Sequence, residues 1–205
     1  MKKANIIYPI IIGEVISLIF LGVLKYAPKY LPEMPSFIIQ LAWYFPIVLP
    51  LLSIFGVFVA SLLTKKIPAL FQLAKFVLVG ALNTFVDFGI LILLLTIFGV
   101  TAGLLYSVSK AFSFSCSVVN SYFWNKFWTF EKKETKGAGK EFGKFYLVAG
   151  IGFLLNVAVA SFVVSAIGPQ FGLSAEIWAI FGAFIAVLCV FVWNFLGYKF
   201  VVFKK

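Results

Sequence analysis

The 205-residue sequence is 63% apolar and only 12% charged, with a net charge of +10. A soluble domain of this length leaves much of its surface exposed and cannot bury so much apolar side chain. The chain has no histidine, and its cysteines, Cys116 and Cys189, lie in apolar stretches without C-x-x-C spacing. We therefore expect a membrane protein that is not an enzyme, with no catalytic residue, no metal and no cofactor.

Six apolar runs follow one another along the chain, each near the ~20 residues that cross ~30 Å of hydrocarbon. In chain order they are residues 6–24, 36–63, 71–98, 104–124, 142–167 and 174–196. A transmembrane barrel would instead show alternating segments of ~10 residues. The pattern predicts an all-α fold, a polytopic transmembrane bundle of about six helices.

Two prolines mark the second run as irregular. Pro46 and Pro50 each remove a backbone donor, so we expect them to kink or break this helix. A re-entrant segment is the alternative for residues 36–63.

The lysines predict the orientation of the helices. All 17 basic residues are lysine, and most lie before the first run, after the second, after the fourth and at the end of the chain. The connections at residues 99–103 and 168–172 carry none, and Lys25 and Lys29, beside Glu33, are the exceptions on the other side. By the positive-inside rule, both termini are expected in the cytoplasm, with the protein in the inner membrane. A nucleic-acid partner is not expected, because these lysines flank apolar runs.

Residues 71–130 and 140–203 form an internal repeat of two helices each. The matched segments are 75–80 (KFVLVG) with 144–149 (KFYLVA), and 126–130 (KFWTF) with 199–203 (KFVVF). Because each unit crosses twice, the repeat is a parallel one, related by an axis along the membrane normal. We expect a two-helix segment over residues 1–66 and a four-helix membrane domain over residues 67–205.

Three segments of this repeat resemble the GtrA-like family. They are residues 76–87 (FVLVGALNTFVD), 125–130 (NKFWTF) and 194–203 (NFLGYKFVVF), and the resemblance covers residues 71–203. The sequence departs from the family pattern at Ser121, where the second unit has Asn194, and at Tyr198, where the first has Asn125. The resemblance implies a flippase that moves polyprenyl-phosphate-linked sugars across the cytoplasmic membrane for cell-surface polysaccharide or teichoic acid glycosylation. Some relatives are instead membrane anchors of polyprenyl-phosphate glycosyltransferases.

Charged side chains at membrane depth are costly and mark candidate sites. Asp87 lies ~18 Å and Lys110 ~24 Å along their helices from the inner boundary, so a pair between them is geometrically possible. Glu14 lies at similar depth and is a rival partner for Lys110. The pair either holds the bundle together or lines a polar path, and Lys110 could alternatively snorkel to the outer surface.

Polar residues at a helical period extend this candidate path along several helices. We expect the path and lipid-binding residues to be Asn83, Asp87, Lys110, Ser117, Asn120, Asn125, Lys126, Asn156, Asn194 and Lys199. Small and hydroxyl residues on the same faces also suit tight helix packing. Lys75, Lys126, Lys144 and Lys199 either report topology alone or attract a lipid phosphate at the inner entrance.

Three functions remain open at this point. The preferred one is translocation of a polyprenyl-phosphate glycolipid. The alternatives are a non-transporting anchor or partner subunit of a membrane glycosyltransferase, and a small proton-coupled exporter that uses Asp87 or Glu14. The expected partners are the glycolipid and membrane lipids, with a membrane glycosyltransferase or a second copy of the chain as candidates.

Overall fold

The computed structural model describes residues 2–31, 35–63 and 68–204, so Glu33, Lys65 and Lys66 lie outside the described residues. The contacts divide the chain into two compact units, Met1–Glu131 (unit 1) and Lys132–Lys205 (unit 2).

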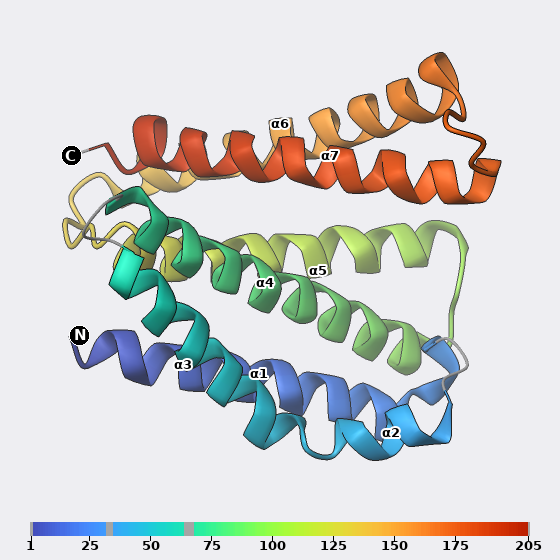
Figure 1. Ribbon diagram of the computed structural model, residues 1–205, viewed down its shortest axis with the longest axis horizontal. Coiled ribbons are helices and arrows are strands. Elements are labelled where there is room, and N and C mark those ends of the chain that lie inside the picture. Colours follow the sequence, from blue (N-terminus) through green and yellow to red (C-terminus); the bar gives the residue numbers. More distant parts are fainter. Residues whose placement is uncertain (1, 32–34, 64–67, 205) are drawn as a thin grey trace. The chain divides into compact units, whose positions relative to one another are not determined.

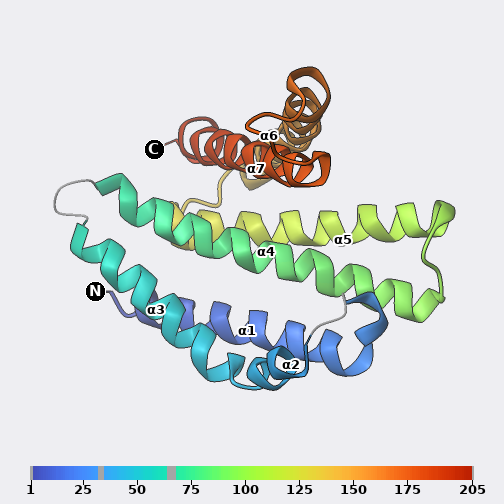
Figure 2. The same cartoon turned by 45° about the vertical axis from the view of Figure 1, so that its right-hand side comes forward.

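Unit 1 is a helical bundle in which α4 lies between α1 and α5 (Figure 1, Figure 2). Its elements are α1 (Ala4–Tyr26), the short η1 (Pro28–Tyr30), α2 (Ser36–Ala42), α3 (Phe45–Leu63), α4 (Pro68–Phe98), α5 (Gly103–Trp124) and the π-turn η2 (Asn125–Thr129). A cluster of buried apolar side chains joins α1, α3, α4 and η2, and consists of Ile12, Ile16, Val57, Val79, Leu82 and Trp128. The two leading transmembrane helices therefore pack onto the first repeat.

Unit 2 is an antiparallel helical hairpin (Figure 1). It consists of α6 (Ala138–Ser161) with the π-helical η3 (Phe162–Ile167), followed by α7 (Ala175–Gly197) with the π-turn η4 (Tyr198–Val202). It contains the second repeat and no counterpart of α1 or α3.

The expected break in the second apolar run is confirmed. Helix α2 ends at Ala42, and α3 begins at Phe45, so Pro46 stands in the first turn of α3, where its missing N–H leaves no helical bond unmade. Pro50 remains inside α3. At seven residues, α2 is only ~10 Å long and cannot itself cross the bilayer.

A polytopic helical bundle is confirmed, and in the described part of the chain five helical stretches are long and apolar enough to cross a membrane. They are Ala4–Tyr26, Phe45–Leu63, Ala69–Phe98, Ala138–Ile167 and Ala175–Val202. The sixth expected crossing, α5, has 22 residues and so reaches ~33 Å. It is less apolar than the others because serines, Asn120 and Lys110 interrupt it, and its crossing stays a prediction.

The sequence repeat appears as the same backbone feature in each unit. The N–H of Phe130 donates to the carbonyl of Asn125, and the N–H of Phe203 donates to the carbonyl of Tyr198, both at 2.8 Å. These i→i−5 bonds define π-turns. Such turns are rare in proteins, and those that occur lie frequently at functional sites. The contacts divide the chain between the repeats, whereas the expected division at residues 66 and 67 rests on sequence relationship and stays a prediction.

Candidate polar path between α4 and α5

An ion pair joins α4 to α5 in the apolar part of unit 1. The Lys110 ammonium lies 2.5 Å from Asp87 Oδ2, and the Ser113 hydroxyl donates to Asp87 Oδ1 at 2.6 Å. The structure therefore contains the Asp87–Lys110 pair that the helix depths allowed, with Lys110 bonded to α4 rather than to Glu14. Ser113, which is fully buried, completes the coordination of the carboxylate. The sequence signal for Ser113 was its place on the same polar stripe of the helix as Lys110, although we did not include it among the expected path residues.

A second polar contact lies one turn towards the N-terminal end of α4. The side-chain amide of Asn120 donates to Asn83 Oδ1 at 2.7 Å, and the Trp124 indole donates to Asn120 Oδ1 at 3.1 Å. Trp124 in turn meets the ring of Tyr8 from α1 edge to face. The structure thus brings Asn83, Asp87, Lys110 and Asn120 together in one polar seam between two apolar helices.

The remaining predicted residues of α5 and η2 are buried and bonded locally. Ser117 donates to the carbonyl of Phe114, and Asn125 donates to the carbonyl and hydroxyl oxygens of Ser121. Lys126 is 1% exposed and donates to the Tyr122 hydroxyl at 3.1 Å. The Asn125 Oδ1 and Thr129 Oγ1 atoms are buried and have no hydrogen-bond partner among the described residues.

A carboxylate that we did not select, Glu131, links the residues before α1 to the N-terminal part of α4. Its two oxygens lie 2.5 Å from the Lys2 ammonium and 3.0 Å from that of Lys75. Lys75 is 1% exposed and also donates to the carbonyl of Trp128 at 3.1 Å. Hydrogen bonds from Lys2 and Lys75 hold the pKa of the Glu131 carboxyl below its usual range, against the opposing effect of partial burial. The sequence signal for Glu131 was its position directly after the KFWTF segment, residues 126–130.

Unit 2 holds the other predicted residues in different surroundings. Asn194 faces Gly152 so closely that a Cβ there would lie 2.8 Å from Asn194 Oδ1, an atom with no hydrogen-bond partner among the described residues. Asn156 is half-buried on α6. The Lys199 ammonium lies 5.5 Å from the ring centroids of both Phe195 and Phe200. Unit 2 contains no Asp–Lys pair equivalent to that of unit 1, because Asn156 stands at the position of Asp87.

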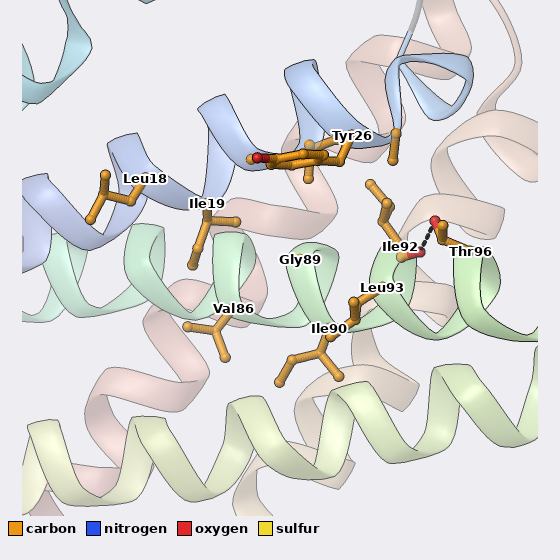
Figure 3. A pocket seen from close by; sticks show the side chains of 12 residues that line it. Leu18, Ile19, Tyr26, Val86, Gly89, Ile90, Ile92, Leu93 and Thr96 are labelled. Carbon is orange, nitrogen blue, oxygen red and sulfur yellow. Dashed lines mark hydrogen bonds between the residues drawn. The ribbon is translucent and has the colours of Figure 1, made fainter.

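An apolar groove of about 420 Å³ lies between α1 and α4 (Figure 3). Ile19 of α1 lies against Gly89 of α4, where a Cβ would come within 2.7 Å of Ile19 Cγ2. The groove is almost free of polar surface, since the Thr96 hydroxyl bonds back to the carbonyl of Ile92. Hydrocarbon suits this groove, whereas a sugar does not.

A family model described as GtrA/DPMS, transmembrane domain, matches residues 75–203. The chain belongs to this family. The match spans both repeats and omits α1 and α3, as the resemblance of residues 71–203 predicts. The family is one of membrane proteins associated with polyprenyl-phosphate sugars.

One curated relative is the uncharacterized membrane protein YngA of Bacillus subtilis (strain 168). It is 38% identical over 87 residues, which cover 40% of this chain and 55% of the relative. The chain thus spans about half the length of the curated relative it matches. No solved structure matches the chain.

Proposed function

We propose that this protein translocates a polyprenyl-phosphate-linked sugar across the cytoplasmic membrane. The observation that carries the proposal is the polar seam of Asp87, Lys110, Ser113, Asn83 and Asn120 within apolar helices of a protein of the GtrA/DPMS family. A sugar head group is rich in hydroxyls, which donate to carboxylate and amide oxygens and accept from ammonium and amide groups. The seam offers both kinds of partner at the depth where lipid offers none.

The transport step needs no covalent chemistry in this proposal. The polar head exchanges its hydrogen bonds with water for bonds along the seam, while its isoprenoid tail stays in hydrocarbon. The apolar groove between α1 and α4 supplies a surface of matching chemistry for that tail (Figure 3). Six crossings, four in unit 1 and two in unit 2, place both termini on the same side of the membrane in this proposal. The lysines at both ends of the chain favour the cytoplasm as that side.

The test is glycolipid translocation in vesicles that contain the purified protein alone. Asp87→Asn keeps the shape of the side chain but removes its charge. The rate of translocation is expected to fall about tenfold or more, the factor that corresponds to the free energy of one charge-assisted hydrogen bond. The matched control is Ser107→Ala on α5. Among the described residues the Ser107 hydroxyl bonds only the carbonyl of Gly103, at 3.3 Å, so its loss leaves the Asp87 contacts in place. Wild-type vesicles without translocation, or an Asp87→Asn variant as active as the wild type, would contradict the proposal.

A second candidate function is a non-transporting partner of a membrane glycosyltransferase. The observation that favours it is that Asp87 and Lys110 satisfy each other, which is also what a purely structural helix contact requires. Under this function, translocation by the protein alone is absent, and co-expression with a polyprenyl-phosphate glycosyltransferase from the same organism raises glycolipid synthesis in the membrane.

A further inference from the structure

The two repeats differ in charge at one equivalent position. Each repeat ends with a π-turn closed by the N–H of a buried phenylalanine, Phe130 in unit 1 and Phe203 in unit 2. The next residue is Glu131 in unit 1 and Lys204 in unit 2. The first helices correspond in the same way, with Lys75 before the buried Phe76 and Lys144 before the buried Phe145.

Unit 1 shows what this backbone arrangement brings together. The residue after the π-turn reaches the lysine of the first helix, as the 3.0 Å contact between Glu131 and Lys75 demonstrates. In unit 2 the two corresponding positions are both occupied by lysines, Lys144 and Lys204. The carboxylate that pairs with Lys75 in unit 1 is thus replaced by a second cation, and two ammonium groups at such positions repel each other.

The surroundings of Lys144 and Lys204 leave both side chains accessible. In unit 1, Lys75 is buried, and Lys2, just before α1, contacts the same Glu131 carboxylate. Unit 2 has no counterpart of α1, and both Lys144 and Lys204 are exposed. The Glu141 carboxylate of α6 lies 2.8 Å from the Lys132 ammonium, which also donates to the carbonyl of Lys204 at 3.4 Å. Glu141 therefore pairs with a lysine other than Lys144 and Lys204. Lys199, half-buried beside Phe195 and Phe200, adds a third positive charge to this end of unit 2.

We propose that Lys144 and Lys204 of unit 2 form a binding site for a phosphate group, the external counterpart of the Glu131 carboxylate in unit 1. A phosphate carries several acceptor oxygens and can bridge two ammonium groups, and Lys binds phosphate as a point charge. The lysines lie at the end of apolar helices, at the depth of lipid head groups, so the phosphate belongs to a membrane lipid. The choice of polyprenyl phosphate as the ligand rests on the proposed function. The site adds to that function that this lipid enters at the second repeat.

The test is lipid binding by the purified full-length chain, measured by native mass spectrometry. The probes are undecaprenyl phosphate, the uncharged polyprenol, phosphatidylglycerol and inorganic phosphate. The wild type is expected to retain undecaprenyl phosphate and to release polyprenol. The Lys144→Gln/Lys204→Gln double variant is expected to bind undecaprenyl phosphate about ten- to hundredfold more weakly, because two charge-assisted contacts are lost.

Two further variants separate the site from general charge and from folding. Lys25→Gln/Lys29→Gln removes two exposed lysines at the other end of unit 1 and should leave the affinity unchanged. Lys204→Glu places a carboxylate where unit 1 has one, and should abolish binding while Lys144 gains an internal partner. Its melting temperature should not fall, which excludes unfolding as the cause.

Each outcome has a defined meaning. Equal losses in the control pair and the double variant, or none in the double variant, overturn the inference. Equally tight binding of phosphatidylglycerol, with the same dependence on Lys144 and Lys204, supports a site for anionic lipids in general, whereas binding of inorganic phosphate alone overturns the lipid assignment. Site-dependent binding by a wild type that translocates nothing overturns the proposed function and leaves the site standing.

Discussion

At the scale of single residues, ion pairs hold together segments that lie far apart in the sequence. Asp87 and Lys110 lie 23 positions apart in the sequence, and their depths along the helices made a pair possible. Depth alone left Glu14 as a rival partner, and the structure pairs Lys110 with Asp87. The role of Glu131 did not follow, since nothing in the sequence shows that Lys2 and Lys75 converge on it. That convergence depends on α1 packing against α4.

Glu131→Gln is expected to destabilise unit 1 by about 1–2 kcal/mol, because the buried Lys75 ammonium loses its carboxylate partner. The effect is moderate since the Glu131 side chain is 39% exposed and water screens the pair. Thermal unfolding in detergent measures it. The matched control is Glu134→Gln, an exposed carboxylate in the following connection, which should leave the melting temperature unchanged.

The same carboxylate predicts a dependence of stability on pH. The folded-state pKa of Glu131 lies below its unfolded value, so its contribution is complete above the ordinary glutamate pKa of about 4.3 and is lost as the pH falls through the folded-state pKa. The wild type should therefore lose its stability advantage over Glu131→Gln in acid. A difference in melting temperature that stayed constant down to acid pH would contradict this role.

At the scale of elements, the contact between α1 and α3 depends on one glycine. A Cβ at Gly13 would lie 2.5 Å from the backbone nitrogen of Pro50, an approach that real Cβ atoms do not make. The prolines in the sequence predicted the break between α2 and α3. They did not predict that Pro50 would face Gly13, because periodicity identifies a helix but not its partner.

Gly13→Ala is expected to force α1 and α3 apart and to destabilise the protein by about 1–3 kcal/mol, as overpacking does. Gly22→Ala, on the same helix, is the matched control, because its Cβ would meet no atom within 4 Å. It should be neutral or slightly stabilising, since alanine favours the helix over glycine by about 1 kcal/mol. Equal melting temperatures for the two variants would show that α1 and α3 do not pack this closely.

At the scale of the whole molecule, the open question is whether α5 crosses the membrane. The helix is long enough, but its serines and Lys110 reduce its hydropathy. It is therefore not among the five described stretches that are both long and apolar enough to cross a membrane. Lys110, Ser113 and Asn120 bond to α4, and most of the serines bond to carbonyls of their own helix, so the energetic cost of placing these groups in the bilayer falls.

We expect α5 to cross, which puts its two ends on opposite sides of the membrane. Single cysteines at Thr101 and Thr135, both exposed, report this after Cys116 and Cys189 have been replaced by alanine. An impermeant maleimide added to intact cells should label Thr101→Cys and not Thr135→Cys. Labelling of both, or of neither until the cells are opened, would contradict the six-crossing topology.

The sequence by itself determined the membrane class, the helical runs, the break at the prolines and the family, because each depends on local composition, period or motif. Only the tertiary structure decided which buried charges meet. Lys75 and Lys144 occupy matching places in a repeat, yet α1 and Glu131 enclose one and leave the other exposed. Burial and ion pairing arise from packing between segments distant in the chain, and no local pattern encodes them.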